Sequence, residues 1–149
     1  MEMNCDRTIQ ARLMALLFVP LALWGGRAMA QEVNPAEMVR AALQAIQMVD
    51  QNRTAELWDG ATPAARKRLG RAEFVNQLAQ QRAPLGAPQQ RTWVAINRQM
   101  VNDADAELAG QYLSVEYETR FAAAASKREL VSFHLERDGV WRFSGYVLK

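Results

Sequence analysis

The positions of proline and aromatic residues divide this 149-residue chain into two parts with different structural preferences. Beyond residue 30, all four prolines fall at or before position 88, whereas eight of the ten aromatic residues come after it. Proline cannot donate a hydrogen bond within a β-ladder, and aromatic side chains favour the pleated surface of a sheet. The sequence therefore predicts one α+β domain over residues 31–149, in which helices precede strands.

Capping and breaking residues place the helices in the first part. An Asn-Pro pair begins a helix predicted over residues 34–50, where apolar residues recur every three or four positions. A short helical turn is predicted at 55–58, and a Thr-Pro pair begins a helix over 62–70 that ends at glycine. A further helix begins at residue 71 and ends where proline and glycine interrupt it, by residue 86.

After residue 90 the hydrophobic period changes to two, which is typical of strands. Alternating apolar and polar residues occur over 92–101, 111–121, 130–136 and 140–148. Connections this short join antiparallel neighbours. We therefore expect a curved four-stranded antiparallel sheet whose apolar face packs on the helices.

The turn at Asp138-Gly139 determines which residues of the last two strands face the core. A two-residue loop would place Phe133 opposite Ser144, whereas a three-residue loop with a left-handed glycine places Phe133 opposite Phe143. The second alternative keeps apolar residues together, so we favour it. The side chains predicted to face the helices are then Leu113, Val115, Tyr117, Phe121, Val131, Phe133, Leu135, Trp141, Phe143 and Val147.

The first 30 residues have the three successive regions of a secretory signal peptide: two arginines, an apolar run over 13–24 and the small-residue end Ala28-Met29-Ala30. The 14 uncharged residues between Arg12 and Arg27 would span only about 21 Å as a helix, less than the roughly 30 Å hydrocarbon core of a membrane. We therefore predict cleavage after Ala30, leaving a periplasmic or secreted protein without a stable membrane anchor.

Cleavage would also change the charge and thiol content. It would remove three of the 18 cations and two of the 16 anions, leaving 15 and 14. A nearly neutral domain has no electrostatic field for nucleic acid, which we exclude as a partner. Cys5 would be removed and His134 is the only histidine, so thiol catalysis, disulfides and zinc sites are excluded and no metal or cofactor is expected.

Several motifs beyond residue 40 resemble the small secreted bacterial proteins grouped as DUF4019, a domain of unknown function. The residues that carry the resemblance are Asp50, Trp58, Arg82-Ala83-Pro84-Leu85-Gly86, Arg91, Gly110-Gln111-Tyr112, Thr119-Arg120-Phe121, Asp138-Gly139-Val140-Trp141-Arg142 and Gly145-Tyr146. The resemblance implies a cystatin-like or NTF2-like cone, with helices against a curved antiparallel sheet. It implies no activity.

Two polar arrangements are formally compatible with hydrolysis. His134 shares a predicted sheet face with Ser132 and Ser144, and a serine triad could be completed by a carboxylate such as Glu118 or Glu136. Glu116 and Glu118 project the same way, roughly 6 to 7 Å apart along a strand, a separation compatible with paired-carboxylate hydrolysis. These residues all fall on the outward phase of strands, where polar residues are expected in any case. We therefore interpret them as a solvent-exposed face, with arginines at 120 and 142 as cross-strand partners of the glutamates.

Arg82 and Arg91 flank the Pro-Leu-Gly turn and together could bind a carboxylate or a phosphate. The alternative, which we favour, is that Arg82 lies in the last turn of a helix, where the backbone dipole favours a cation. Arg91 would then be an ordinary charge on an edge strand.

Four aromatic residues, Trp58, Trp93, Trp141 and Tyr146, could line a pocket between the helices and the sheet or belong to an ordinary core, which we favour. An enzyme would need a carboxylate with a raised pKa in that pocket, and Asp50 and Asp59, at predicted helix ends, are the nearest. The leading hypothesis is a non-catalytic exported module that binds a small molecule or a protein; the alternative is a small pocket enzyme. The candidate ligand-contacting residues are Trp58, Arg82, Arg91, Tyr112, Trp141 and Tyr146.

Overall fold

A computed structural model of the chain describes residues 33–149, so the predicted signal segment lies outside the described part. Residues Gln31–Lys149 belong to one compact unit. In chain order the elements are α1 (Pro35–Asp50), α2 (Thr54–Asp59), α3 (Pro63–Arg68), α4 (Arg71–Arg82), the 3₁₀ turn η1 (Ala83–Leu85), β1 (Pro88–Val101), β2 (Gly110–Phe121), β3 (Lys127–Leu135) and β4 (Trp141–Leu148). The α+β prediction is confirmed. None of the helices within residues 33–149 is long and apolar enough to cross a membrane.

The predicted helix starts are confirmed by their caps. The side chain of Asn34 accepts a hydrogen bond from Ala36 N at 3.0 Å, and Thr62 Oγ1 accepts one from Ala65 N at 3.1 Å. In both helices proline occupies the first turn, where its missing N–H costs nothing. Helix α4 continues into η1, and the chain leaves it through Gly86, whose φ of 73° suits glycine.

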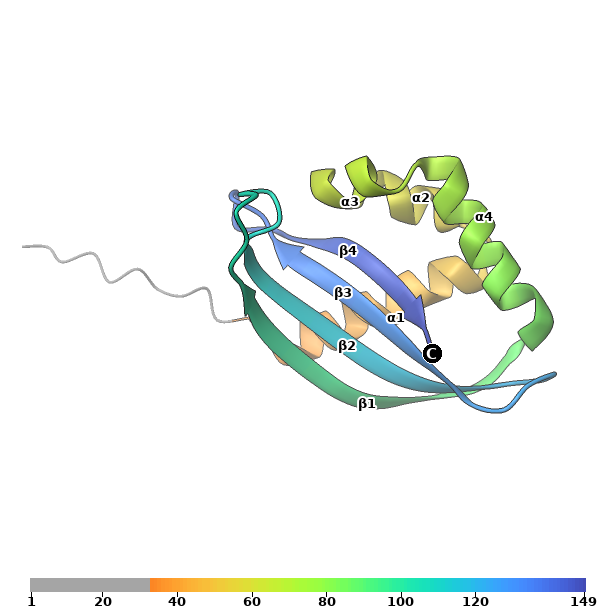
Figure 1. Ribbon diagram of the computed structural model, residues 1–149. Helices are drawn as coiled ribbons and strands as arrows, with labels where there is room; N and C mark the ends of the chain where they lie inside the picture. The colour runs from red at the N-terminus through yellow and green to blue at the C-terminus, as the bar shows by residue number, and fades with distance from the viewer. Residues whose placement is uncertain (1–32) are drawn as a thin grey trace, which may run out of the picture. The chain divides into compact units, whose positions relative to one another are not determined.

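The four strands form one antiparallel sheet in the order β1-β2-β3-β4. Figure 1 shows the sheet curving past α1, with α2, α3 and α4 on the side of β4 and β1 at the opposite edge. Strand β1 begins at Pro88, four residues earlier than the sequence predicts, because proline is tolerated as the first residue of an edge strand.

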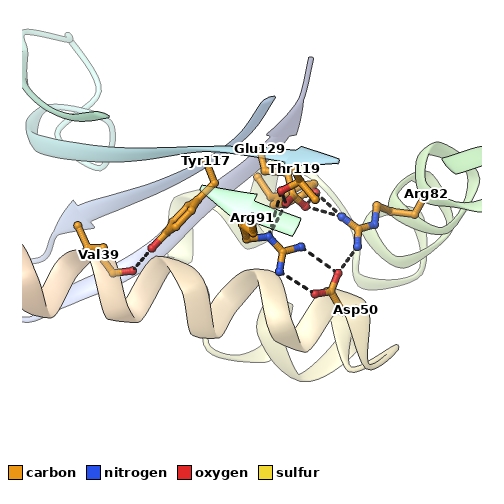
Figure 2. Close-up of polar contacts among 8 residues, drawn as sticks. Val39, Asp50, Arg82, Arg91, Tyr117, Thr119 and Glu129 are labelled. Atoms are coloured by element: carbon orange, nitrogen blue, oxygen red, sulfur yellow. Dashed lines mark hydrogen bonds and ion pairs between the residues drawn. The ribbon is translucent and has the colours of Figure 1, made fainter. Parts of the chain in front are cut away.

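The core lies between α1 and the inner face of the sheet. Strand β2 alternates buried and partly buried residues over most of its length, as a sheet with one covered face should. Tyr117 links the two layers, since its hydroxyl donates to the carbonyl oxygen of Val39 in α1 at 2.8 Å (Figure 2). The fully buried side chains include Ile46, Leu113, Val115, Phe121 and Val131.

The predicted three-residue loop between β3 and β4 is confirmed. Phe133 pairs with Phe143 and Leu135 with Trp141, and Gly139 has a φ of 78°. This left-handed glycine completes the bulged turn that a three-residue hairpin loop requires.

The prediction that Val147 faces the core is wrong. A bulge shifts the register between the pairs Ser132–Gly145 and Phe133–Phe143, so Ser144 is an additional residue in β4. An additional residue reverses the faces of everything that follows it. Tyr146 is therefore the buried residue, at 9% exposure, and Val147 is 45% exposed.

Candidate functional site

The most unusual feature of the described chain is a buried group of polar side chains at one end of the sheet. Its members, which we call the charge cluster, are Asp50, Arg82, Arg91, Thr119, Glu129 and Tyr146. Helices α1 and α4 and strands β1, β2, β3 and β4 each contribute one of these residues. Figure 2 shows the side chains of Arg82 and Arg91 meeting Asp50 on one side and Glu129 on the other.

Glu129 is the centre of the charge cluster and is fully buried. Its Oε1 accepts hydrogen bonds from Arg82 and, at 2.6 Å, from the Tyr146 hydroxyl. Its Oε2 accepts from the Thr119 hydroxyl and, at 2.8 Å, from Arg91 Nε. Each carboxylate oxygen thus has two donors, which compensates for the loss of water around a buried charge.

Asp50 balances the remaining positive charge. Arg91 donates to both of its carboxylate oxygens, at 3.1 and 3.3 Å, and Arg82 donates to one of them. Asp50 is the last residue of α1, where the helix dipole disfavours an anion and the last turn holds no basic residue. The two guanidinium groups from other elements offset this cost, so the end of α1 is held against α4 and β1.

Burial and neighbouring charges shift two protonation equilibria in the charge cluster. Burial raises the pKa of Tyr146, and the negative charge of Glu129 raises it further, so the phenol stays a neutral donor. For Arg82, burial alone would lower the pKa, but the neighbouring oxygens of Tyr146, Glu129 and Asp50 raise it overall. Arg82 also lies over the ring of Phe121, with its central carbon 4.7 Å from the ring centre, a favourable cation–π contact.

The arrangement leaves no open charge for a ligand. Two cations and two anions neutralise one another, and both arginines are consumed by carboxylates of the same chain. Arg82 lies in the last turn of α4 and Arg91 on the edge strand β1, as favoured from the sequence. The prediction that Arg91 is an ordinary surface charge is wrong, because its side chain is only 13% exposed and paired with two carboxylates. A surface depression of about 400 Å³ reaches the cluster, where Asp50 and Arg82 form part of its wall.

Comparison with known protein families agrees with the motifs in the sequence. The model of the family described as "Protein of unknown function (DUF4019)" matches residues 41–146. The chain belongs to the DUF4019 family. A search of curated proteins found no match. All six residues of the charge cluster lie within the region of the DUF4019 protein that matches the family model.

The two carboxylates proposed as bases do not have the surroundings that the role requires. Asp50 is bound to two arginines in the charge cluster. Asp59 is half-exposed and forms an ion pair with Arg71, with Oδ1 2.8 Å from Arg71 Nε. The hydrogen bond from Arg71 holds the pKa of Asp59 below its ordinary value, the opposite of the shift that a general base in an apolar pocket needs.

The four aromatic residues do not line a common pocket. Trp58 packs against the core and donates its indole N–H to the carbonyl oxygen of Leu69 at 2.9 Å. Trp93 is 50% exposed on β1, and Tyr146 belongs to the charge cluster. Trp141 packs against the core, and its buried Nε1 has no hydrogen-bond partner among the described residues. Trp58, Trp141 and Tyr146 thus belong to the core, as favoured from the sequence, whereas the prediction is wrong for Trp93.

Tyr112 lies away from the charge cluster, in a second polar group beneath the β1–β2 loop. Its hydroxyl donates to Leu108 O at 3.0 Å, and its ring lies 4.5 Å from the His134 ring. His134 is buried, with Nδ1 3.1 Å from Glu136 Oε1 and Nε2 3.2 Å from Ala109 O. Both ring nitrogens thus face acceptors other than a serine hydroxyl, which excludes the triad geometry in this arrangement.

Gly110 offers a direct test of how closely the β1–β2 loop packs on His134. A Cβ at position 110 would lie 2.7 Å from His134 Nε2, and the φ of 136° disfavours a side chain. We expect Gly110→Ala to lower the free energy of unfolding by about 1 to 3 kcal/mol, measured by urea denaturation. Gly145→Ala is the matched control, because its Cβ would meet no atom within 4 Å. Equal stability of the two variants would contradict this packing.

The glutamates of the outer face have a different partner from the two arginines predicted. Arg128 lies 3.2 Å from Glu116 and 3.6 Å from Glu118, because β3 places it directly opposite Glu118. Arg142 instead pairs with Asp138 at 2.8 Å. The prediction that the two glutamates lie in an ion-paired outer face is confirmed, but its predicted pairs are wrong. His134, which was predicted to lie on the same solvent-exposed face, is buried instead.

Glu129 and Thr119 were not predicted from the sequence as members of the site. A signal for Glu129 was present, because it shares the inward phase of its strand with Val131 and Phe133. A carboxylate at a core position needs buried donors. The two arginines flanking the Pro-Leu-Gly turn were the available candidates.

Proposed function

We propose that this DUF4019 protein is an exported, non-catalytic binding or interaction module, acting in the periplasm or outside the cell, with a cystatin-like or NTF2-like fold. The observation that carries the proposal is the internal balance of the charge cluster. Its four charged groups each contact an opposite charge of the same cluster. A buried network in which every charge is paired holds the contributing elements together, and this supports a structural role for the cluster rather than a catalytic one.

The alternative, a small pocket enzyme, has less support. Asp50 and Asp59, its two candidate bases, are both ion-paired with arginine. In contrast, large apolar side chains are exposed on the sheet, among them Trp93, Met100 and Val147. Apolar side chains lose unfavourable contact with water when another molecule covers them, so they support a role in binding a small molecule or a protein. The near-neutral charge of the segment after residue 30 argues against nucleic acid.

The binding role can be tested in the producing cells by site-specific photo-crosslinking. A photoreactive amino acid is placed at Met100 on β1, at Val147 on β4 and, as the control, at the exposed Gln80 on α4. We expect a discrete adduct from a sheet position and none from Gln80. Two results together would favour the enzyme over the binding module. They are the absence of any adduct from the sheet positions, and substrate turnover by the purified protein that Asp50→Asn abolishes.

Export is tested separately by the mass of the protein recovered outside the cytoplasm. We expect its chain to begin at Gln31, because small residues precede that position and the apolar run is short. Recovery of an intact chain starting at Met1 would contradict the proposal.

A further inference from the structure

The two edges of the sheet differ in how their backbone groups are used. At the β4 edge, Thr62 N donates to Phe143 O at 2.9 Å, so the segment before α3 covers part of the edge. Across residues 33–149, the backbone of β1 (Pro88–Val101) forms its sheet hydrogen bonds with β2 alone. Strand β1 is therefore the open edge, and Figure 1 shows it on the side of the sheet away from α2, α3 and α4. An open edge can accept an additional strand.

The side chains along the inner side of this edge form an apolar row with one charge. Register with β2 places Trp93, Ile96, Arg98 and Met100 on the side that faces α1. Trp93 is 50% and Met100 60% exposed, so two large apolar side chains remain uncovered along the edge. Beside them a groove of about 310 Å³ lies between β1 and the start of α1, with Val33, Pro35, Ile96 and Leu113 in its wall.

Among the residues that the structure describes, Arg98 is the only charged one that lines this groove. In the described part of the chain Arg98 forms no ion pair, whereas Arg91 on the same strand is consumed by the charge cluster. Strand β1 contains no aspartate or glutamate. Among the described residues, the open edge thus offers one guanidinium without an ion-pair partner, with Ile96 two residues before it and Met100 two residues after it.

From this edge we propose a partner for the binding module: an extended segment of another protein that pairs with β1 and places an acidic residue opposite Arg98, with apolar residues two positions to either side. Side chains directly opposite each other on one face of a sheet interact, so the acid would meet Arg98 while the apolar residues lie beside Ile96 and Met100. A second copy of β1 fits less well, because it has no carboxylate to place opposite Arg98. The proposal rests on the proposed function and names the partner class.

The proposal is tested with fluorescently labelled ten-residue peptides and the purified full chain. One peptide has a central glutamate, with threonine and valine alternating on both sides of it so that valine lies two positions away in each direction. The other peptide has lysine in place of the glutamate. We expect the glutamate peptide to bind more tightly in fluorescence polarisation. Arg98→Glu should weaken it about threefold to tenfold and reverse the order of the two peptides, as expected for one cross-strand charge pair changed from attractive to repulsive.

Arg137→Glu is the matched control. Arg137 is an exposed arginine in the β3–β4 loop, also without an ion pair among the described residues, so its reversal makes the same change in net charge at another place. We expect the order of the two peptides to be unchanged. Met100→Lys should weaken both peptides, because it replaces an apolar contact at the edge.

Three outcomes would overturn the proposal. The two peptides could bind equally or not at all, Arg98→Glu could act no differently from Arg137→Glu, or light scattering could show a dimer that Arg98→Glu dissociates. The last result would assign β1 to a second copy. Photo-crosslinks at Val147 without peptide binding at β1 would leave the binding module in place and remove only the acidic segment as its partner.

Discussion

Replacing Glu129 with alanine should lower the free energy of unfolding by about 3 to 5 kcal/mol. The substitution removes the acceptor of four hydrogen bonds and leaves two guanidinium groups, each only 13% exposed, with Asp50 as their sole counterion. Water cannot freely replace the lost carboxylate, because Glu129 itself is fully buried. The loss is therefore the cost of uncompensated buried charge, which exceeds the value of any single surface ion pair.

Urea denaturation at neutral pH, followed by tryptophan fluorescence, measures this difference. Glu118→Ala is the matched control, because it makes the same substitution on the neighbouring strand, where the glutamate side chain is 45% exposed and its pair with Arg128 is partly solvated. We expect Glu118→Ala to cost less than about 1 kcal/mol. If Glu129→Ala does not fold, Glu129→Gln keeps the shape of the side chain and removes only the charge.

A cost for Glu129→Ala no greater than that for Glu118→Ala would show that Glu129 is solvated, contrary to the structure. It would also weaken the functional argument. A solvated cluster would leave Arg82 and Arg91 available to an external carboxylate or phosphate, the anion site considered from the sequence. The same pair of variants therefore tests the packing of the cluster and the premise of the proposed function.

The helices and strands were accessible from the sequence because their signals are local. Asn34 and Thr62 cap helices through contacts within three residues, and Gly139 sets the hairpin register through its own backbone. Each of these signals depends only on residues close together in the chain. The α+β order and the β3–β4 pairing could therefore be predicted without a structure.

The charge cluster was not accessible in the same way, because its contacts join residues far apart in the chain. Arg82 meets Asp50 across 32 positions and Glu129 across 47. The sequence pattern places Arg82 in the last turn of a helix, where the helix dipole favours a positive charge. Because this local interaction already explained an arginine at position 82, there was no reason in the sequence to expect its long-range ion pairs. Glu129 occupies an inward-facing position of its strand. This was the one sequence signal that contacts between near neighbours in the chain could not explain.

The bulge in β4 could not be predicted from the alternation of apolar residues, and it determines which of Tyr146 and Val147 is buried. A second large effect on stability is therefore expected at these two positions. Strict alternation from Phe143 places Val147 inside, whereas the structure places Tyr146 inside. We expect Tyr146→Ala to lower the free energy of unfolding by about 3 to 5 kcal/mol, the usual cost of truncating a buried aromatic residue. Val147→Ala, one residue further on the exposed face, should cost less than about 1 kcal/mol.

Tyr146→Phe separates the two contributions of this side chain. The ring is retained and only the hydroxyl that donates to Glu129 at 2.6 Å is removed, so we expect a cost of about 1.5 to 3 kcal/mol, typical of a hydrogen bond to a charged group. Urea denaturation curves for Tyr146→Ala, Tyr146→Phe and Val147→Ala measure the contributions of the ring and of the hydroxyl group. A larger loss for Val147→Ala than for Tyr146→Ala would mean that β4 has no bulge. Tyr146 would then face outward and could not donate to Glu129. Glu129 would keep only three of its four hydrogen-bond donors, and the charge cluster would lack one of its six members.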